Sequence, residues 1–294
     1  MALPAALKAF AGEIDAVLDG LIDNSFGREG RLFEAMRYAV LLGGKRLRPF
    51  LVVASADMFM VSRDCSLRVG AAAEMVHAYS LVHDDLPCMD NDDLRRGKLA
   101  THRKFDEATA VLAGDTLLTR AFEVIGAHET HELAEVRSDL VQALAVAAGG
   151  RGMAGGQMFD LEAEGHPLEM PEITRLQAMK TGALLAFCCE AGAILGQASD
   201  LHRVALHRYA QDLGLAFQIR DDLLDVEGDV ATVGKKIGKD AAAGKATFVS
   251  ILGVERAREQ AEMLVNQAVS HLEDFGVAAE RLREVAHFVI ERES

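Results

Sequence analysis

The chain has 294 residues, of which 50% are hydrophobic and 26% charged, a composition typical of a soluble globular protein rather than a disordered or fibrous one. Asp and Glu number 45 against 31 Lys and Arg, so the formal charge is −14 and non-specific binding to nucleic acid or anionic lipid is disfavoured. An anionic ligand would therefore need a local basic site or a metal ion. Four cysteines, two of them adjacent at Cys188 and Cys189, indicate a reducing compartment, and we expect a cytoplasmic protein.

The N-terminal segment MALPAALKAF has no basic region followed by a long apolar stretch, so we expect an ordinary helix there and no signal peptide. The longest weakly charged segment, 182–196, contains Glu190 and is shorter than the roughly 18 to 20 apolar residues that span a bilayer. We therefore expect a buried helix at 182–196 and no membrane span.

The spacing of prolines and apolar residues favours helices over most of the chain. The five prolines lie at positions 4, 49, 87, 167 and 171, so the C-terminal region can be helical almost throughout. Apolar residues from Leu201 to Leu224 recur with a helical period, and no segment alternates with a period of two. No stretch is long or polar enough to be an interdomain linker. We predict one all-α domain over residues 1–294.

An aspartate-rich segment, HDDLPCMDNDD, ends an apolar helix that we predict over 71–86. Like charges about 4 Å apart cost roughly 4 kcal/mol at an effective dielectric constant of 20, so Asp84 and Asp85 need a compensating charge. Asp90 would point about 120° away from Asp84 if the helix continued. Pro87 ends or kinks the helix, so a short loop can bring Asp90 back towards Asp84 and Asp85. Three converging carboxylates favour a hard cation such as Mg²⁺. The alternative is a solvated acidic helix end.

A second acidic cluster, Asp221, Asp222 and Asp225, lies in AFQIRDDLLDVEGD. The spacing i, i+4 places Asp221 and Asp225 within about 40° of each other on one helical face, with Asp222 beside them. Apolar neighbours such as Phe217 and Leu224 indicate a mostly buried helix rather than a solvated one. Two such clusters predict a site for metal ions and a polyanion, with carboxylates on two opposite sides.

Basic residues near glycines supply candidate contacts to an anion. They are Lys45, Arg46 and Arg48 in GGKRLRP, Arg95 and Arg96, Lys180 with Thr181, and Lys235, Lys236, Lys239 and Lys245. Arginine binds phosphate with two parallel hydrogen bonds, and lysine binds it as a point charge. The segment GKKIGKDAAAGK lacks the residue order of a P-loop. Each group alone is typical of a solvated surface, so the prediction depends on their combination with the carboxylates.

Together these motifs resemble those of the trans-polyprenyl diphosphate synthases. HDDLPCMDNDDLRRG is similar to the first aspartate-rich motif of that family, and FQIRDDLLDVEGD with the following GK…GKD…GK is similar to the second. GGKRLRP, MKTGAL and AYSLVHDD also match, in the family's order, from about residue 40 to 250. The enlargement of the first motif by Pro87 and Cys88 resembles the bacterial farnesyl diphosphate synthase type.

The resemblance implies an isoprenoid synthase fold, a single helical bundle around a central active-site cavity, and a homodimer. It implies up to three Mg²⁺, with Mn²⁺ as an alternative, held on an allylic diphosphate by Asp84, Asp85, Asp90, Asp221, Asp222 and Asp225. It implies contacts to the allylic substrate from Arg95, Lys180, Thr181, Gln218 and Lys235, with Lys245 as a further candidate. It implies contacts to isopentenyl diphosphate from Lys45, Arg48, His77 and Arg96. The catalytic set it implies is Asp84, Asp85, Asp90, Arg95, Lys180, Asp221 and Lys235.

The implied reaction is ionisation, condensation and elimination. Metal and cationic side chains stabilise the leaving diphosphate, the isopentenyl double bond attacks the allylic cation, and a proton is lost to the departed diphosphate. No protein nucleophile or base is required. Apolar helices would exclude water from the cation.

Product length should depend on Tyr79 and Ser80, which precede Asp84 by five and four residues and so lie about one helical turn deeper. An aromatic residue followed by a small one resembles the bacterial farnesyl pattern, in which the ring forms a floor near fifteen carbons. The alternative is that Tyr79 is a packed core residue with its hydroxyl satisfied.

Several other functions share some of these features. A geranylgeranyl diphosphate synthase has every motif and differs in cavity depth. A class I terpene cyclase needs no second diphosphate site, and Lys45, Arg48 and Arg96 argue against it. Intact carboxylates argue against a non-catalytic subunit of a prenyl synthase. His83 before Asp84 would suit a metal phosphohydrolase, but that site needs another histidine well upstream, and His77 is the first in the chain.

Overall fold

The computed structural model describes residues 2–23, 27–163, 165–166, 168–227 and 247–292. These residues are predominantly helical, and the strands among them are the two-residue segments β1 (Leu94–Arg95) and β2 (Lys98–Leu99), which pair antiparallel. The predicted all-α fold class is confirmed. The chain forms two compact units, which we call unit 1 (Met1–Val53 with Val61–Val141) and unit 2 (Ala54–Met60 with Gln142–Ser294).

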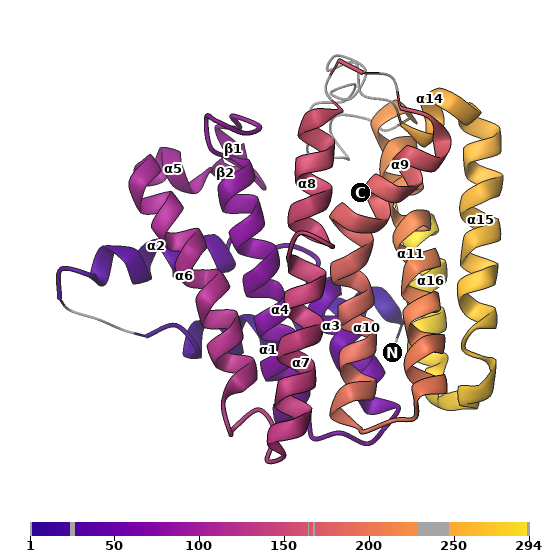
Figure 1. Cartoon of the computed structure of the whole chain (residues 1–294), viewed down its shortest axis with the longest axis horizontal. Helices are drawn as coiled ribbons and strands as arrows, with labels where there is room; N and C mark the ends of the chain where they lie inside the picture. Colours follow the sequence, from indigo (N-terminus) through magenta and orange to yellow (C-terminus); the bar gives the residue numbers. More distant parts are fainter. Residues whose placement is uncertain (1, 24–26, 164, 167, 228–246, 293–294) are drawn as a thin grey trace. The chain divides into compact units, whose positions relative to one another are not determined.

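Unit 1 is built around one helix that is buried along most of its length. Its helices are α1 (Leu3–Gly20), α2 (Gly30–Val40), the first part of α3 (Leu47–Asp57), α4 (Arg63–Asp84), α5 (Thr101–Lys104), α6 (Glu107–Gly126) and the first part of α7 (Ala134–Ala148). Helix α4 packs against α6, and α2 packs against both (Figure 1). Residues 70–73 of α4 are glycine and alanine, so neighbouring helices approach closely, and a Cβ on Gly70 would lie 3.0 Å from Pro49 of α3.

Unit 2 is also a set of packed helices. They are the ends of α3 and α7, then α8 (Met153–Glu162), α9 (Met170–Gln177), the π-helical turn η1 (Ala178–Gly182), α10 (Ala183–Leu195), α11 (Asp200–Glu227), α14 (Phe248–Leu252), α15 (Val254–Ser270), the 3₁₀ segment η2 (Glu273–Ala279) and α16 (Glu280–Glu291). Helix α11 packs against α10, α15 and α16 (Figure 1). The fully buried Tyr209 ties α11 to α16 by donating its hydroxyl to the carbonyl of Leu282 at 2.7 Å.

Helices α9, η1 and α10 continue one another as the segment Met170–Leu195, which is long and apolar enough by composition to cross a membrane. In the structure, 67% of its apolar window is buried inside the protein, which is typical of the core helix of a globular protein. Glu190, the one charged residue of α10, accepts two hydrogen bonds from Arg203 of α11, at 2.8 and 3.0 Å. The buried helix predicted over 182–196 is confirmed by α10.

Candidate active site

The first aspartate-rich motif lies where α4 ends. The helix stops at Asp84, and the following loop turns back, because the backbone N–H of Asp90 donates to the carbonyl of Asp84 at 2.8 Å. Asn91, with a φ of 51°, donates its N–H to the carbonyl of Leu86 at 3.1 Å and closes the same loop. The prediction that the helix ends before Pro87 and that a loop returns Asp90 to Asp84 is confirmed.

Asp85 has the compensating charge that the sequence requires. Its side chain is 3% exposed, and the guanidinium of Arg95 donates from Nε to its two oxygens at 2.9 and 3.2 Å, with a further hydrogen bond from Nη2. Burial raises the pKa of the Asp85 carboxyl, and the hydrogen bonds from Arg95 oppose this shift. Asp85 and Arg95 thus form a buried ion pair beside Asp84.

Arg95 and Arg96 reach this site from a tight hairpin. Strands β1 and β2 are joined by Arg96 and Gly97, whose φ angles of 53° and 75° are typical of a type I′ turn. The guanidinium of Arg96 lies against Gly44, where a Cβ would come within 2.6 Å of Arg96 Cζ. Gly44 also has a φ of 121°, so its backbone angle favours glycine, and a Cβ here would displace the guanidinium of Arg96. The GGKRLRP loop and the hairpin therefore meet at this point.

Within GGKRLRP the three basic residues have different environments. Arg46 is buried and donates to Glu74 of α4 at 2.6 Å, to Asp15 of α1 at 2.8 Å and to the carbonyl of Val40 at 2.5 Å, so it holds helices together. Lys45 is exposed. Arg48 keeps a buried Nε that has no hydrogen-bond partner among the described residues. Because an unpaired buried donor is costly, this atom suits a ligand with acceptor oxygens.

His77 lies in a cavity of unit 1 that also exposes polar groups from the hairpin and from α4. Among its lining residues are His77, Glu74, Asp85, Arg95, Arg96 and Thr101. Burial lowers the pKa of His77 well below its usual value. The charges of four arginines lower this pKa further, in the order Arg48, Arg96, Arg95 and Arg46. The cavity itself is only about 10 Å³, room for about one water molecule, but the guanidinium groups around the neutral imidazole give this part of unit 1 a positive charge that attracts an anion.

Tyr79 and Ser80 lie one turn before Asp84 on α4. Tyr79 is partly buried, and its ring meets that of His83 edge to face, with 5.8 Å between centroids. Burial raises the pKa of the Tyr79 hydroxyl, and the charge of Asp84 adds to this shift. Ser80 donates its hydroxyl to the carbonyl of His77 at 2.9 Å. The Tyr79 hydroxyl is not among the buried polar atoms that lack a partner, so the floor and the packed-core interpretations of this residue both stay predictions.

In unit 2, Lys180 and Thr181 lie on the π-helical turn η1. The ammonium of Lys180 donates to Asp160 of α8 at 2.7 Å. Asp160 belongs to none of the motifs predicted from the sequence. The available signal was an acidic residue in GGQMFDLE, next to glycines and apolar residues.

The second aspartate-rich motif lies near the end of α11. Asp222 is buried, and its two oxygens accept from the backbone N–H of Phe248 at 2.9 Å and from Gln218 Nε2 at 3.1 Å. Asp221 accepts from Arg292 at 2.5 Å, while Asp225 is partly buried. Asp222 thus joins the start of α14 to α11. The prediction that it also binds metal stays a prediction.

Arg292 was not selected from the sequence, because nothing near the C-terminus marks it. Its side chain is 6% exposed and lies over the ring of Phe217, with 3.9 Å from Cζ to the ring centroid. Its own carbonyl accepts two hydrogen bonds from Arg220, at 2.6 and 3.0 Å. The end of α16 is therefore fixed to α11 beside Asp221.

The six predicted metal ligands are all carboxylates, the donor type that Mg²⁺ prefers. Asp85, Asp221 and Asp222 accept hydrogen bonds from protein donors, and no group of three acidic, histidine or cysteine side chains in the described residues is arranged as a metal site. The donor chemistry fits Mg²⁺. Lys235 and Lys245 lie outside the described residues.

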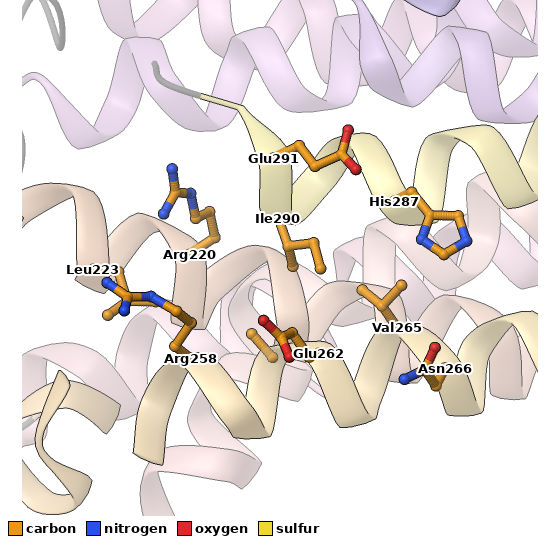
Figure 2. A pocket seen from close by; sticks show the side chains of 10 residues that line it. Arg220, Leu223, Arg258, Glu262, Val265, Asn266, His287, Ile290 and Glu291 are labelled. Carbon is orange, nitrogen blue, oxygen red and sulfur yellow. The ribbon is translucent and has the colours of Figure 1, made fainter. Parts of the chain in front are cut away.

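A separate cavity of about 400 Å³ lies between α11, α15 and α16 of unit 2. Figure 2 shows that Arg220 and Arg258 line it, together with His287, Glu262 and Glu291. None of the site residues predicted from the motifs lines this cavity.

Comparison with known proteins places these motifs in a family. The model of the polyprenyl synthetase family matches residues 29–284. Farnesyl diphosphate synthase of Escherichia coli is 42% identical over 299 residues, which is 99% of each chain, and that of Bacillus subtilis is 43% identical over 89% of each. The crystal structure of an FPP/GFPP synthase from Zymomonas mobilis superposes with a TM-score of 0.90, at 49% identity and 98% coverage of both chains. This chain therefore belongs to the polyprenyl synthetase family and has its all-α isoprenoid synthase fold.

Proposed function

We propose that this protein is a farnesyl diphosphate synthase, a prenyltransferase that condenses isopentenyl diphosphate with dimethylallyl and then geranyl diphosphate. Relatives at about 40% identity over most of the chain carry that activity in their names. The single structural observation that carries the proposal is the cluster of His77, Arg95 and Arg96 next to the first aspartate-rich motif.

We propose that isopentenyl diphosphate binds on the basic side of unit 1. The unpaired Nε of Arg48 and the guanidinium of Arg96 would donate to its phosphate oxygens, and His77 and Lys45 would complete the set. A bound diphosphate would offset the mutual repulsion of the arginines around His77, which gives the site its preference for an anion.

We propose that the allylic diphosphate is held by Arg95, Lys180, Thr181 and Gln218, with Lys235 and Lys245 as further contacts. The carboxylates of Asp84, Asp85, Asp90, Asp221, Asp222 and Asp225 would hold Mg²⁺, up to three ions, with Mn²⁺ as an alternative. When bound, the metal supplies positive charge that stabilises the leaving diphosphate. Arg95 and Lys180 stabilise the same developing charge through hydrogen bonds, and the departed diphosphate accepts the proton that the condensed product loses.

We propose that Tyr79 forms the floor of the chain-length cavity, with Ser80 leaving room beside it. The position of Tyr79 about one turn below Asp84, its partial burial and its contact with His83 support this role. We also propose that both units belong to one synthase domain over residues 1–294, and that the protein acts as a cytoplasmic homodimer. Four free cysteines support a reducing compartment.

The test is to incubate the purified protein with Mg²⁺, labelled isopentenyl diphosphate and dimethylallyl diphosphate, and to determine the product chain length after dephosphorylation. A dominant fifteen-carbon alcohol is expected. A twenty-carbon product would replace the assignment by a geranylgeranyl diphosphate synthase. No condensation, even with geranyl diphosphate, would overturn the proposal in favour of a cyclase or a non-catalytic subunit.

A matched pair of variants tests the aspartate-rich motif itself. Asp84→Asn should lower kcat by about 100-fold or more, the usual cost of removing one group that stabilises charge in a transition state. Asp93→Asn changes a neighbouring aspartate whose side chain is 66% exposed and which we place outside the site. It should retain the wild-type rate. Equal losses in the two variants would contradict the assignment.

A further inference from the structure

The π-helical turn η1 interrupts the α-helical segment Met170–Leu195 at the residues that carry Lys180 and Thr181. Such turns are rare, and they are frequent at functional sites. Helices α8 and α11 pack closely against the backbone of this turn. A Cβ on Gly156 of α8 would lie 2.3 Å from the backbone nitrogen of Lys180, and a Cβ on Gly214 of α11 would lie 3.2 Å from Cα of Gly182. Glycines on both sides therefore allow α8 and α11 to contact the backbone of the turn.

Helix α8 also fixes the side chain of Lys180. Asp160 follows Gly156 by four residues and so lies on the same face of α8. Its carboxylate is 14% exposed and accepts from Lys180 Nζ at 2.7 Å. One face of α8 thus holds both the backbone of Lys180, through Gly156, and its ammonium, through Asp160.

A neighbouring residue on α8 adds an independent sign of a ligand. Gln157 precedes Asp160 by three residues, which places the two side by side on the helix. Its Nε2 is buried and has no hydrogen-bond partner among the described residues. An unpaired buried donor beside a lysine suits a ligand that carries acceptor oxygens.

We propose that Asp160 is a positioning residue, which orders the ammonium of Lys180 so that it already points to the allylic diphosphate before that substrate binds. This inference rests on the proposed function, because it places Lys180 at that diphosphate. A lysine ammonium has three N–H donors, so a hydrogen bond to Asp160 leaves donors for phosphate oxygens. Without Asp160, the long side chain would have to lose its rotamer freedom on binding.

A double-mutant cycle between positions 160 and 180 tests whether Asp160 acts through Lys180. The four proteins are wild type, Asp160→Asn, Lys180→Gln and the double variant, and the quantity measured is kcat/KM for geranyl diphosphate at saturating isopentenyl diphosphate. Asp160→Asn should lower this value by about 10-fold in the wild-type background, the size of a lysine's ordering cost. In the Lys180→Gln background the same change should cost less than about 2-fold.

A second measurement does not depend on turnover. This measurement is titration calorimetry with inorganic diphosphate and Mg²⁺. Asp160→Asn should weaken the affinity of the protein for diphosphate when Lys180 is present, and should leave that affinity unchanged in the Lys180→Gln background. The control is Glu162→Gln, which removes an exposed carboxylate from the same helix and should leave both values unchanged. Urea unfolding of all five proteins shows whether a loss arises from a damaged fold.

The outcomes separate this inference from the proposed function. If the wild-type protein condenses prenyl diphosphates but the effects of the two substitutions multiply independently, the positioning role is wrong and the function stands. If the wild-type protein forms no prenyl product, the function is wrong and the inference falls with it. Strong coupling in both kcat/KM and diphosphate affinity supports the inference.

Discussion

Replacing His77 by Gln should remove a pH-dependent loss of stability from the protein. In the folded chain, burial and four neighbouring arginines hold the pKa of His77 well below 6.5, so the imidazole stays neutral. In the unfolded chain, histidine titrates near its ordinary value of about 6.5. Below that pH the unfolded state binds a proton that the folded state does not, so the free energy of unfolding falls as the pH falls.

The magnitude follows from proton linkage. A group that is neutral in the folded state and has a pKa of about 6.5 in the unfolded state costs about 1.4 kcal/mol of stability between pH 7.5 and pH 5.5. This loss of stability is nearly absent well above pH 6.5. It grows as the pH falls through 6.5 and continues to grow below pH 5.5 until His77 itself titrates in the folded protein. His77→Gln keeps a polar side chain but cannot take up this proton.

Urea unfolding at pH 7.5, 6.5 and 5.5, followed by far-UV circular dichroism, measures the effect as the difference between wild type and His77→Gln. All other titrating groups are shared, so their contributions cancel in this difference. The stability of wild type relative to the variant should fall by about 1.4 kcal/mol over the two pH units. The native imidazole signal of His77, assigned by NMR through its absence in the variant, should not move over this range. A flat or rising difference, or a signal that titrates near pH 6.5, would refute the reasoning.

Three further substitutions test other parts of the structure. Tyr79→Ala should shift the product from fifteen carbons towards twenty or more, because the ring no longer closes the cavity, and an unchanged chain length by chromatography would contradict the floor assignment. Glu74→Leu should lower the free energy of unfolding by about 3 to 5 kcal/mol, because it leaves the buried Arg46 without this partner, and a urea midpoint equal to that of wild type would argue against a structural pair. Arg292→Gln should tighten Mn²⁺ binding measured by electron paramagnetic resonance, since the guanidinium no longer competes for Asp221, and an equal or weaker affinity would contradict such competition.

The parts of the site that follow from local rules were predictable from the sequence. Pro87 cannot continue a helix, so the end of α4 and the return of Asp90 followed from one residue. The apolar segment 182–196 was too apolar to be exposed, so a buried helix was predictable, but its continuation into the longer helix Met170–Leu195, long and apolar enough by composition to cross a membrane, was not. In both cases the deciding interactions lie within a few residues along the chain.

Interactions between residues far apart in the chain could not be predicted in this way. Arg46 belongs to a basic motif and was grouped with anion contacts, but its guanidinium is buried against Glu74 of α4 and Asp15 of α1. Glu74 alone gave a hint, as a charge inside an apolar helix. Arg292 and Asp160 meet their partners only because α16 and α8 pack where they do. No pattern of spacing in a single sequence contains those distances.

The π-helical turn also fixes how many residues this part of the chain can hold. It contains one residue more than an α-helix would need to reach the same point, and each residue turns a helix by about 100°. Deleting a single residue from 178–182 would leave a regular helix that reaches the same point, so α10 could keep its buried face, but the turn would no longer present Lys180 to α8 at the same position. Insertions and deletions should therefore be excluded from this short stretch in chains that use the same lysine, even though a straight helix would be the simpler structure.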